Sequence, residues 1–172
     1  MRHDRGKGLD RTRRESMIHF VGAGCGAADL ITVRGKKLLE QADVIIYAGS
    51  LVNPALLDYK KDGCRVYDSA KMTLEEVLSV MFDAEAAGLD TVRLHTGDPC
   101  LYGAIREQMD ELDKRSMAYE VVPGVSSVNA AAAALQAEYT PIPLPCFCAS
   151  TIFLSLFSIC IPSFKINISQ LT

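Results

Sequence analysis

The chain has 172 residues, 49% of them hydrophobic, and its formal net charge at pH 7 is −3. This size predicts one domain or slightly more with a sizeable core, and the negative charge with no Trp argues against a general nucleic-acid binder. The 6 Cys form no CxxC pair and no zinc-ligand spacing, so we expect reduced thiols, no metal site and a cytoplasmic location.

Strands and helices are predicted to alternate along the chain. Leu30, Val33, Leu38 and Leu39 have helical spacing and are candidate core residues. The alternation predicts an α/β fold, with a mainly parallel sheet and helices on both faces. In chain order we expect a strand at Ile18–Val21, a helix at Leu30–Gln41, a strand at Val44–Tyr47, a short helix at Leu51–Tyr59, a strand at Arg65–Tyr67, a helix at Thr73–Ala87, a strand at Thr91–Leu94, a helix at Tyr102–Arg115, a strand at Tyr119–Val122 and a helix at Val125–Ala137.

Two helix starts carry local signals. Thr73 and Glu76 are spaced as a capping box, in which each side chain accepts a hydrogen bond from the other residue's backbone N–H. Asp98 suits the N-cap of the following helix, and Pro99 suits its first position.

The two ends of the chain differ in composition from residues 17–140. Residues 1–16 carry an excess of Arg and Lys and are expected to be a disordered basic extension rather than a binding arm. Residues 141–172 are apolar with no acidic residue, and we expect a truncated or frameshifted second domain there. A membrane anchor and an extra core element remain alternatives, although Cys146–Ile161 is shorter than the roughly 20 residues of a membrane span.

The first strand runs into a glycine turn, Gly22-Ala-Gly24-Cys-Gly26-Ala27. A turn of this form lets the backbone approach a ligand closely, as in dinucleotide-binding folds. Those folds also need an acidic residue at the end of the second strand, where this chain has Ala48-Gly-Ser50. Asp43 lies at the start of that strand, the wrong end. A nicotinamide-dependent oxidoreductase and a purely structural turn therefore stay as alternatives.

Two further strands end in loops with glycine. His95–Gly103 places Gly97 and Asp98 after one strand, and Val121–Ser127 places a Pro-Gly pair before Ser126 and Ser127. Each polar side chain can either cap a helix or contact a ligand, and an acidic group suits a cationic sulfonium. Because open parallel sheets bind ligands at their carboxyl edge, the three loops predict one shared cleft.

The stretches Val21–Thr32, Asp43–Val52, His95–Ile105 and Pro123–Ser127 together resemble the tetrapyrrole methylase family over about residues 17–140. Tyr47–Val52 favours the branch that methylates carbon 11 of precorrin-4 or cobalt-precorrin-4 in cobalamin biosynthesis. The resemblance implies the N-terminal domain of a two-domain α/β enzyme, usually a homodimer. S-adenosylmethionine would lie between the domains, with the corrin precursor in a trough above it.

The resemblance also implies roles for individual residues. Asp98 is the candidate catalytic residue, in an electrostatic or proton-handling role, whereas His95 is expected to be a strand-end residue rather than a base. The glycine turn of Gly22, Gly24 and Gly26 would border the substrate trough. Residues implied to contact the methyl donor are Thr96, Gly97, Asp98, Leu101, Tyr102, Ser126 and Ser127.

The chain departs from the family pattern in two respects. Cys100 stands where Ser is common, and residues 141–172 do not match the family's second half. Methyl transfer by this chain alone is therefore expected to be impaired, and a non-catalytic remnant or binding module is a further alternative. We expect no nucleic-acid partner and no membrane association.

Overall fold

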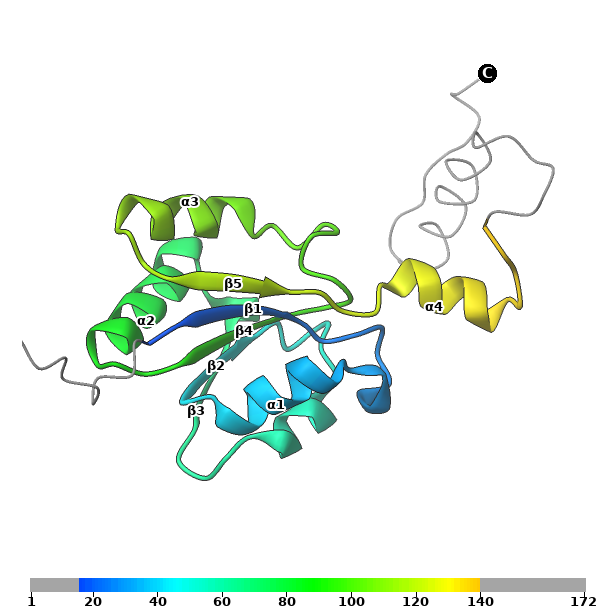
Figure 1. The fold of residues 1–172 in the computed structure, drawn as a ribbon, viewed down its shortest axis with the longest axis horizontal. Coiled ribbons are helices and arrows are strands. Elements are labelled where there is room, and N and C mark those ends of the chain that lie inside the picture. Colours follow the sequence, from blue (N-terminus) through cyan, green and yellow to red (C-terminus); the bar gives the residue numbers. More distant parts are fainter. Residues whose placement is uncertain (1–15, 140–172) are drawn as a thin grey trace, which may run out of the picture.

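A computed structural model describes residues 16–139, which form a parallel sheet of five strands with helices on both faces (Figure 1). The basic extension and the apolar tail expected from the sequence lie outside the described residues, apart from Ser16. The sheet order is β3-β2-β4-β1-β5 and every strand pair is parallel. The strands are β1 (Ile18–Gly22), β2 (Val44–Tyr47), β3 (Arg65–Asp68), β4 (Thr91–His95) and β5 (Tyr119–Val122).

Helices α2 and α3 cover one face of the sheet, and α1 with the 3-10 turn η2 covers the other (Figure 1). Helix α4 lies beyond the carboxyl edge of the sheet (Figure 1). This arrangement confirms the predicted α/β fold. The helices are α1 (Val33–Gln41), α2 (Leu74–Ala86), α3 (Arg106–Lys114) and α4 (Ser127–Ala134), and the 3-10 turns are η1 (Ala28–Leu30), η2 (Pro54–Tyr59) and η3 (Ser69–Lys71).

The core has two halves because successive side chains of a strand point to opposite faces of the sheet. Phe20 and Ile46 pack into the half beneath α2 and α3, whereas the neighbouring Val21 and Ile45 pack into the half beneath α1 and η2. Strands buried on both faces read as continuous apolar runs, which is why their positions were predictable.

The predicted core face of the first helix is only partly right. Leu39 is fully buried and Leu38 packs against the core, but Leu30 is exposed and Val33 is 72% exposed. The hydroxyl of Thr32 accepts a hydrogen bond from the N–H of Gly35, so α1 begins at Val33. Leu30 belongs to the separate turn η1, and helical spacing does not continue across this boundary.

The two predicted helix starts have opposite outcomes. Thr73 and Glu76 form the expected capping box at the start of α2. The expected helix start at Asp98 and Pro99 is wrong, because α3 begins only at Arg106. Residues 99–102 form a turn instead, and Tyr102 takes a left-handed φ of 58° that interrupts a right-handed helix.

The other helices also begin later than predicted. Asn53 caps η2, which starts at Pro54, and Ser126 caps α4, which starts at Ser127 and ends at Ala134. Within residues 16–139, no helix combines the length and apolar character that a membrane crossing requires.

Candidate functional site

The loops that follow β1 and β4 are joined through their backbones at the carboxyl edge of the sheet. The N–H of Gly97 donates to the carbonyl of Gly24 at 2.8 Å, and the N–H of Gly24 donates to the carbonyl of Gly97 at 3.3 Å. The N–H of Ala23 donates to the carbonyl of His95 at 2.7 Å. The first glycine turn and the second glycine loop are therefore one continuous structure.

Asp98 joins the loop after β5 to this pair. One oxygen of its carboxylate accepts the N–H of Gly124 at 3.0 Å, and the other accepts the N–H of Cys100 at 2.8 Å. The sequence predicted the acceptor role of Asp98 but placed its donors in the following helix. In the structure its donors lie in two different loops, so the carboxylate fixes their relative position.

Two glycines, Gly22 and Gly124, make this close approach possible. A Cβ atom on Gly22 would lie 2.5 Å from the Cα of Gly124, and one on Gly124 would lie 2.2 Å from the carbonyl oxygen of Gly97. No side chain fits in this space. Gly22 and Gly24 are buried, and Gly26 is exposed. Within the turn that was predicted to border a substrate, Gly22 therefore has a packing role of its own.

The residues predicted to contact a methyl donor lie on the loops after β4 and β5. Leu101 and Tyr102 are exposed, with Tyr102 76% exposed. Ser127 is exposed at the start of α4, whereas Ser126 is buried and its hydroxyl accepts the N–H of Val128 at 3.2 Å. The structure thus brings these residues to one edge, and it gives Ser126 the capping role that the sequence left open.

Thr96 is half-buried, and its hydroxyl oxygen is a buried atom with no hydrogen-bond partner among the described residues. Buried polar atoms nearly always have a partner in a protein, a water or a ligand. Thr96 directly precedes Gly97, which takes a left-handed φ of 64°. An unpaired hydroxyl at this corner fits a ligand with a polar group.

The segment between Pro99 and α3 holds an unusual backbone conformation. Tyr102 and Ala104 have φ values of 58° and 49°, and a Cβ on Gly103 would lie 2.1 Å from the carbonyl oxygen of Pro99. Left-handed non-glycine residues cost on the order of 1–3 kcal/mol each and are concentrated at functional sites. Sequence reasoning included Leu101 and Tyr102 among the donor contacts but missed the left-handed backbone, because neither Tyr nor Ala signals this conformation.

Two buried basic side chains lie on β4 on the face covered by α2 and α3. Burial lowers the pKa of Arg93 to about 10. Burial, and secondarily the positive charge of Arg93, lowers the pKa of His95 to about 3, so its imidazole is neutral at pH 7. The Nε2 atom of His95 has no partner among the described residues. Sequence reasoning missed Arg93, although a basic residue inside an apolar strand was a signal.

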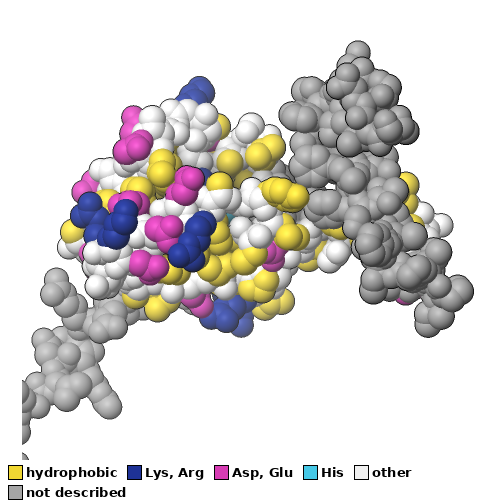
Figure 2. Space-filling view, turned by 90° about the horizontal axis from the view of Figure 1, so that it is seen from above, with side chains coloured by type: hydrophobic (Ala, Val, Ile, Leu, Met, Phe, Trp, Pro, Cys, Tyr) yellow, Lys and Arg dark blue, Asp and Glu magenta, His cyan; other side chains and the backbone are white. Residues whose placement is uncertain are grey.

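Exposed apolar side chains are concentrated near the carboxyl edge. Leu30 follows β1, Leu51 follows β2, and Leu101 and Tyr102 follow β4. Figure 2 shows acidic and basic side chains interspersed over the opposite part of the molecule, and hydrophobic side chains more frequent toward α4. Exposed apolar groups in a cluster are typical of a binding surface.

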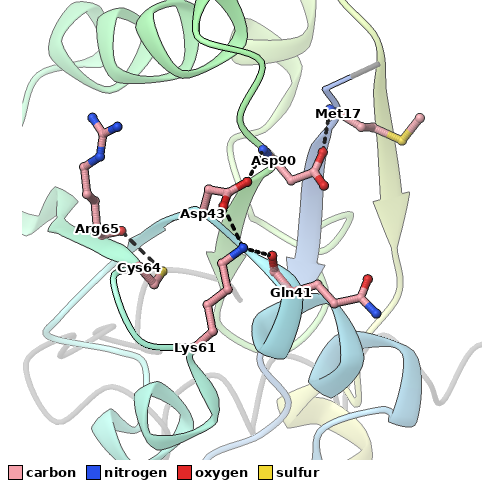
Figure 3. Close-up of polar contacts among 7 residues, drawn as sticks. All are labelled: Met17, Gln41, Asp43, Lys61, Cys64, Arg65 and Asp90. Atoms are coloured by element: carbon pink, nitrogen blue, oxygen red, sulfur yellow. Dashed lines mark hydrogen bonds and ion pairs between the residues drawn. The ribbon is translucent and has the colours of Figure 1, made fainter. Parts of the chain in front are cut away.

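Polar contacts at the opposite, amino edge of the sheet are structural (Figure 3). Asp43 accepts hydrogen bonds from the ammonium of Lys61 at 2.6 Å and from the N–H of Asp90 at 3.0 Å. Asp90 in turn accepts the N–H of Met17 at 3.1 Å. Asp43 therefore cannot serve a dinucleotide ribose at the carboxyl edge. Among the described residues, no group of three or more His, Cys, Asp or Glu could hold a metal ion.

Sequence comparison connects this chain to a known family. The profile of the Tetrapyrrole (Corrin/Porphyrin) Methylases matches residues 17–142. A cobalt-precorrin-4 C(11)-methyltransferase of Methanocaldococcus jannaschii is 54% identical over 132 residues, which are 77% of this chain and 50% of the relative. A precorrin-4 C(11)-methyltransferase of a Sinorhizobium species is 50% identical over 123 residues, covering 72% of this chain and 49% of the relative.

Solved structures agree with the sequence comparison. The X-ray structure of a cobalt precorrin-4 methyltransferase, a cobalamin biosynthetic enzyme, has a TM-score of 0.75 and 49% identity over 80% of this chain and 57% of that chain. A uroporphyrin-III C-methyltransferase of Thermus thermophilus complexed with S-adenosylhomocysteine has a TM-score of 0.62 and 30% identity, over 75% and 52% of the two chains. The chain spans about half the length of the relatives that it matches.

Proposed function

The chain belongs to the tetrapyrrole (corrin/porphyrin) methylase family, and on this basis we propose that it acts in methyl transfer from S-adenosylmethionine to carbon 11 of precorrin-4 or cobalt-precorrin-4. The identity of 54% to a cobalt-precorrin-4 C(11)-methyltransferase supports this substrate over those of more distant family members. The reaction would be a step of cobalamin biosynthesis, and the corrin precursor would be the partner molecule.

The observation that carries this proposal is the joining of three glycine-bearing loops into one corner at the carboxyl edge. The unpaired hydroxyl of Thr96 lies at this corner beside the left-handed Gly97. Leu101 and Tyr102 add exposed apolar surface next to it. A hydroxyl, an approachable backbone and an apolar wall fit a nucleoside sulfonium, which has polar, charged and apolar parts.

S-adenosylmethionine, when bound, supplies an electrophilic methyl group on a positively charged sulfur. In our proposal, Thr96 and Gly97 bind and orient this donor, while Leu101 and Tyr102 exclude water from one side of it. The carboxylate of Asp98, held by Cys100 and Gly124, adds fixed negative charge near the corner. The chain needs no covalent nucleophile, because alignment of the reacting atoms at roughly 3–3.5 Å supplies much of the acceleration.

The proposal includes a cytoplasmic homodimer. The thiols of Cys25, Cys64 and Cys100 are free in the structure, which is consistent with a reducing compartment. We propose the dimer from the resemblance to the family alone, whose members are usually homodimers. Because the matched region is about half of each relative, we propose that the other wall of the donor cleft corresponds to the unmatched half of those relatives.

Calorimetric titration of the chain with S-adenosylhomocysteine tests the donor site, and NADH serves as the competing ligand. We expect binding of S-adenosylhomocysteine and none of NADH. Methyl transfer from labelled S-adenosylmethionine to a precorrin-4-type substrate then tests the reaction, with weak turnover expected from this chain alone. Preference for the nicotinamide ligand would overturn the proposal in favour of an oxidoreductase.

A further inference from the structure

The guanidinium of Arg93 is buried in the half of the core beneath α2 and α3. There it forms hydrogen bonds with residues of other elements. Its Nη1 donates to the carbonyl of Ile46 at 3.3 Å, and its Nε donates to the side-chain oxygen of Gln108 at 3.4 Å. No carboxylate forms an ion pair with Arg93 within residues 16–139. The group therefore connects β2, β4 and α3 through hydrogen bonds alone.

The side-chain amide of Gln108 extends this hydrogen-bonded connection toward the corner of the three glycine-bearing loops, where we place the methyl donor. Its oxygen must face Arg93, because a guanidinium only donates, and this leaves its NH₂ group as a donor. That group donates to the carbonyl of Ala104 at 3.2 Å. Gln108 is buried, so both polar ends of its side chain need these partners.

Ala104 is the last left-handed residue of the strained segment that contains Tyr102. The Asp98–Gly124 hydrogen bond holds the other end of the same segment. A conformation that is unfavourable by itself persists only where surrounding contacts hold it in place. Here, a polar contact at each end limits the conformations of residues 98–105.

We propose that Gln108 and Arg93 are positioning residues for the methyl-donor site. Gln108 fixes Ala104, and Arg93 fixes Gln108, so that Leu101 and Tyr102 are presented to the donor in one conformation. Neither residue needs to touch the donor. This inference rests on the proposed function, because it assigns the residues a role in binding of that ligand.

Two substitutions of Gln108 distinguish a role in positioning the donor site from a role in the stability of the fold. In Gln108→Glu the carboxylate, ionised beside the guanidinium, keeps an acceptor for Arg93 and strengthens that contact, but it has no donor for the carbonyl of Ala104. Gln108→Met has about the same volume and loses both contacts. Gln41→Glu makes the same chemical change at the exposed end of α1 and serves as the control.

For each variant of the 172-residue chain we would measure amide exchange of residues 101–105, the thermal midpoint, and the Kd for S-adenosylhomocysteine. Gln108→Glu should accelerate exchange in this segment and raise the Kd about three- to tenfold, the effect of one lost hydrogen bond. Its thermal midpoint should stay unchanged, because the charge-assisted contact with Arg93 offsets the hydrogen bond lost to Ala104. Gln108→Met should do the same and also lower the midpoint. Gln41→Glu should change neither exchange nor Kd.

The possible failures can be told apart. Unchanged exchange or unchanged affinity in Gln108→Glu would overturn the positioning role and leave the proposed function intact. Absence of S-adenosylhomocysteine binding by the unsubstituted chain would overturn the proposed function and this inference together. A fall in affinity that simply follows the thermal midpoint across both variants would also overturn the inference, because it would indicate a structural role only.

Discussion

The carboxylate of Asp98 accepts the backbone N–H of Gly124 at 3.0 Å, and this hydrogen bond crosses the end of the strand between them. Asp98 follows β4 and Gly124 follows β5, whereas β1 lies between these strands in the sheet. The crossing is possible because β1 ends in Gly22, where a Cβ would lie 2.6 Å from both the N of Gly124 and the carbonyl oxygen of Gly97. The carboxylate of Asp98 with Gly22, Gly97 and Gly124 therefore defines the corner at which we propose that the methyl donor binds.

The first prediction concerns Asp98→Asn. An amide has one oxygen, so one of the N–H groups of Cys100 and Gly124 loses its acceptor. We expect the free energy of unfolding to fall by about 1–3 kcal/mol, together with weaker binding of S-adenosylhomocysteine. Urea denaturation and calorimetry measure the two effects. Asp110→Asn removes an exposed ion pair to Arg106 and should cost less than about 0.5 kcal/mol, so equal losses would contradict the prediction.

The second prediction concerns backbone contact at Gly124. In Gly124→Ala the new Cβ would lie 2.2 Å from the carbonyl oxygen of Gly97, so one loop must move. We expect a loss of about 1–3 kcal/mol in urea denaturation and a weaker donor site. Gly63→Ala has open space around its Cβ but a φ of 79°, so it should cost about 1 kcal/mol without affecting the donor. An unchanged Kd for S-adenosylhomocysteine in Gly124→Ala would contradict the proposal that the donor binds where the three loops meet.

The third prediction uses two threonines whose hydroxyls are both buried and unpaired, Thr96 and Thr91. Replacing either Thr by Val removes a buried hydroxyl that has no hydrogen-bond partner within residues 16–139. Each change should therefore leave the free energy of unfolding unchanged or raise it by about 1 kcal/mol. Only Thr96→Val should weaken binding of S-adenosylhomocysteine, about three- to tenfold, because Thr91 lies at the amino end of β4. Identical affinities in both variants would exclude Thr96 from the donor contacts.

The fourth prediction is a pH dependence caused by His95. Its pKa is about 3 in the folded chain, lowered by burial and then by Arg93, against 6.5 in the unfolded chain. Below pH 6.5 the unfolded chain therefore binds the extra proton, and stability falls as the pH falls toward 3. From pH 7 to pH 5 this group should cost about 2 kcal/mol.

His95→Met isolates that contribution. Met has similar size and no titrating group, so the variant should lose about 2 kcal/mol less than the unsubstituted chain between pH 7 and pH 5. Urea denaturation at the two pH values measures the difference, in which the contributions of carboxylates shared by both proteins cancel. Parallel pH profiles would show that His95 is protonated as readily in the folded chain as in the unfolded one.

The sequence was sufficient for the parts of the fold that depend on local pattern. Apolar runs such as Val44–Tyr47 marked strands that are covered on both faces, and the Thr73–Glu76 capping box marked the start of α2. Alternation of these elements implied a parallel sheet, and a parallel sheet places all strand ends at one edge. The sequence alone therefore predicted that the three glycine loops lie together at one edge of the sheet.

By itself, then, the sequence determined the α/β fold, the family and the edge of the sheet that holds the candidate site. Only the tertiary structure decided that Asp98 joins two loops instead of starting a helix, that Tyr102 and Ala104 are left-handed, and that Gln108 connects Ala104 to Arg93. The physical reason is that spacing and propensity act within a few residues. These contacts join atoms of separate elements, whose distances are set only when the two halves of the core pack.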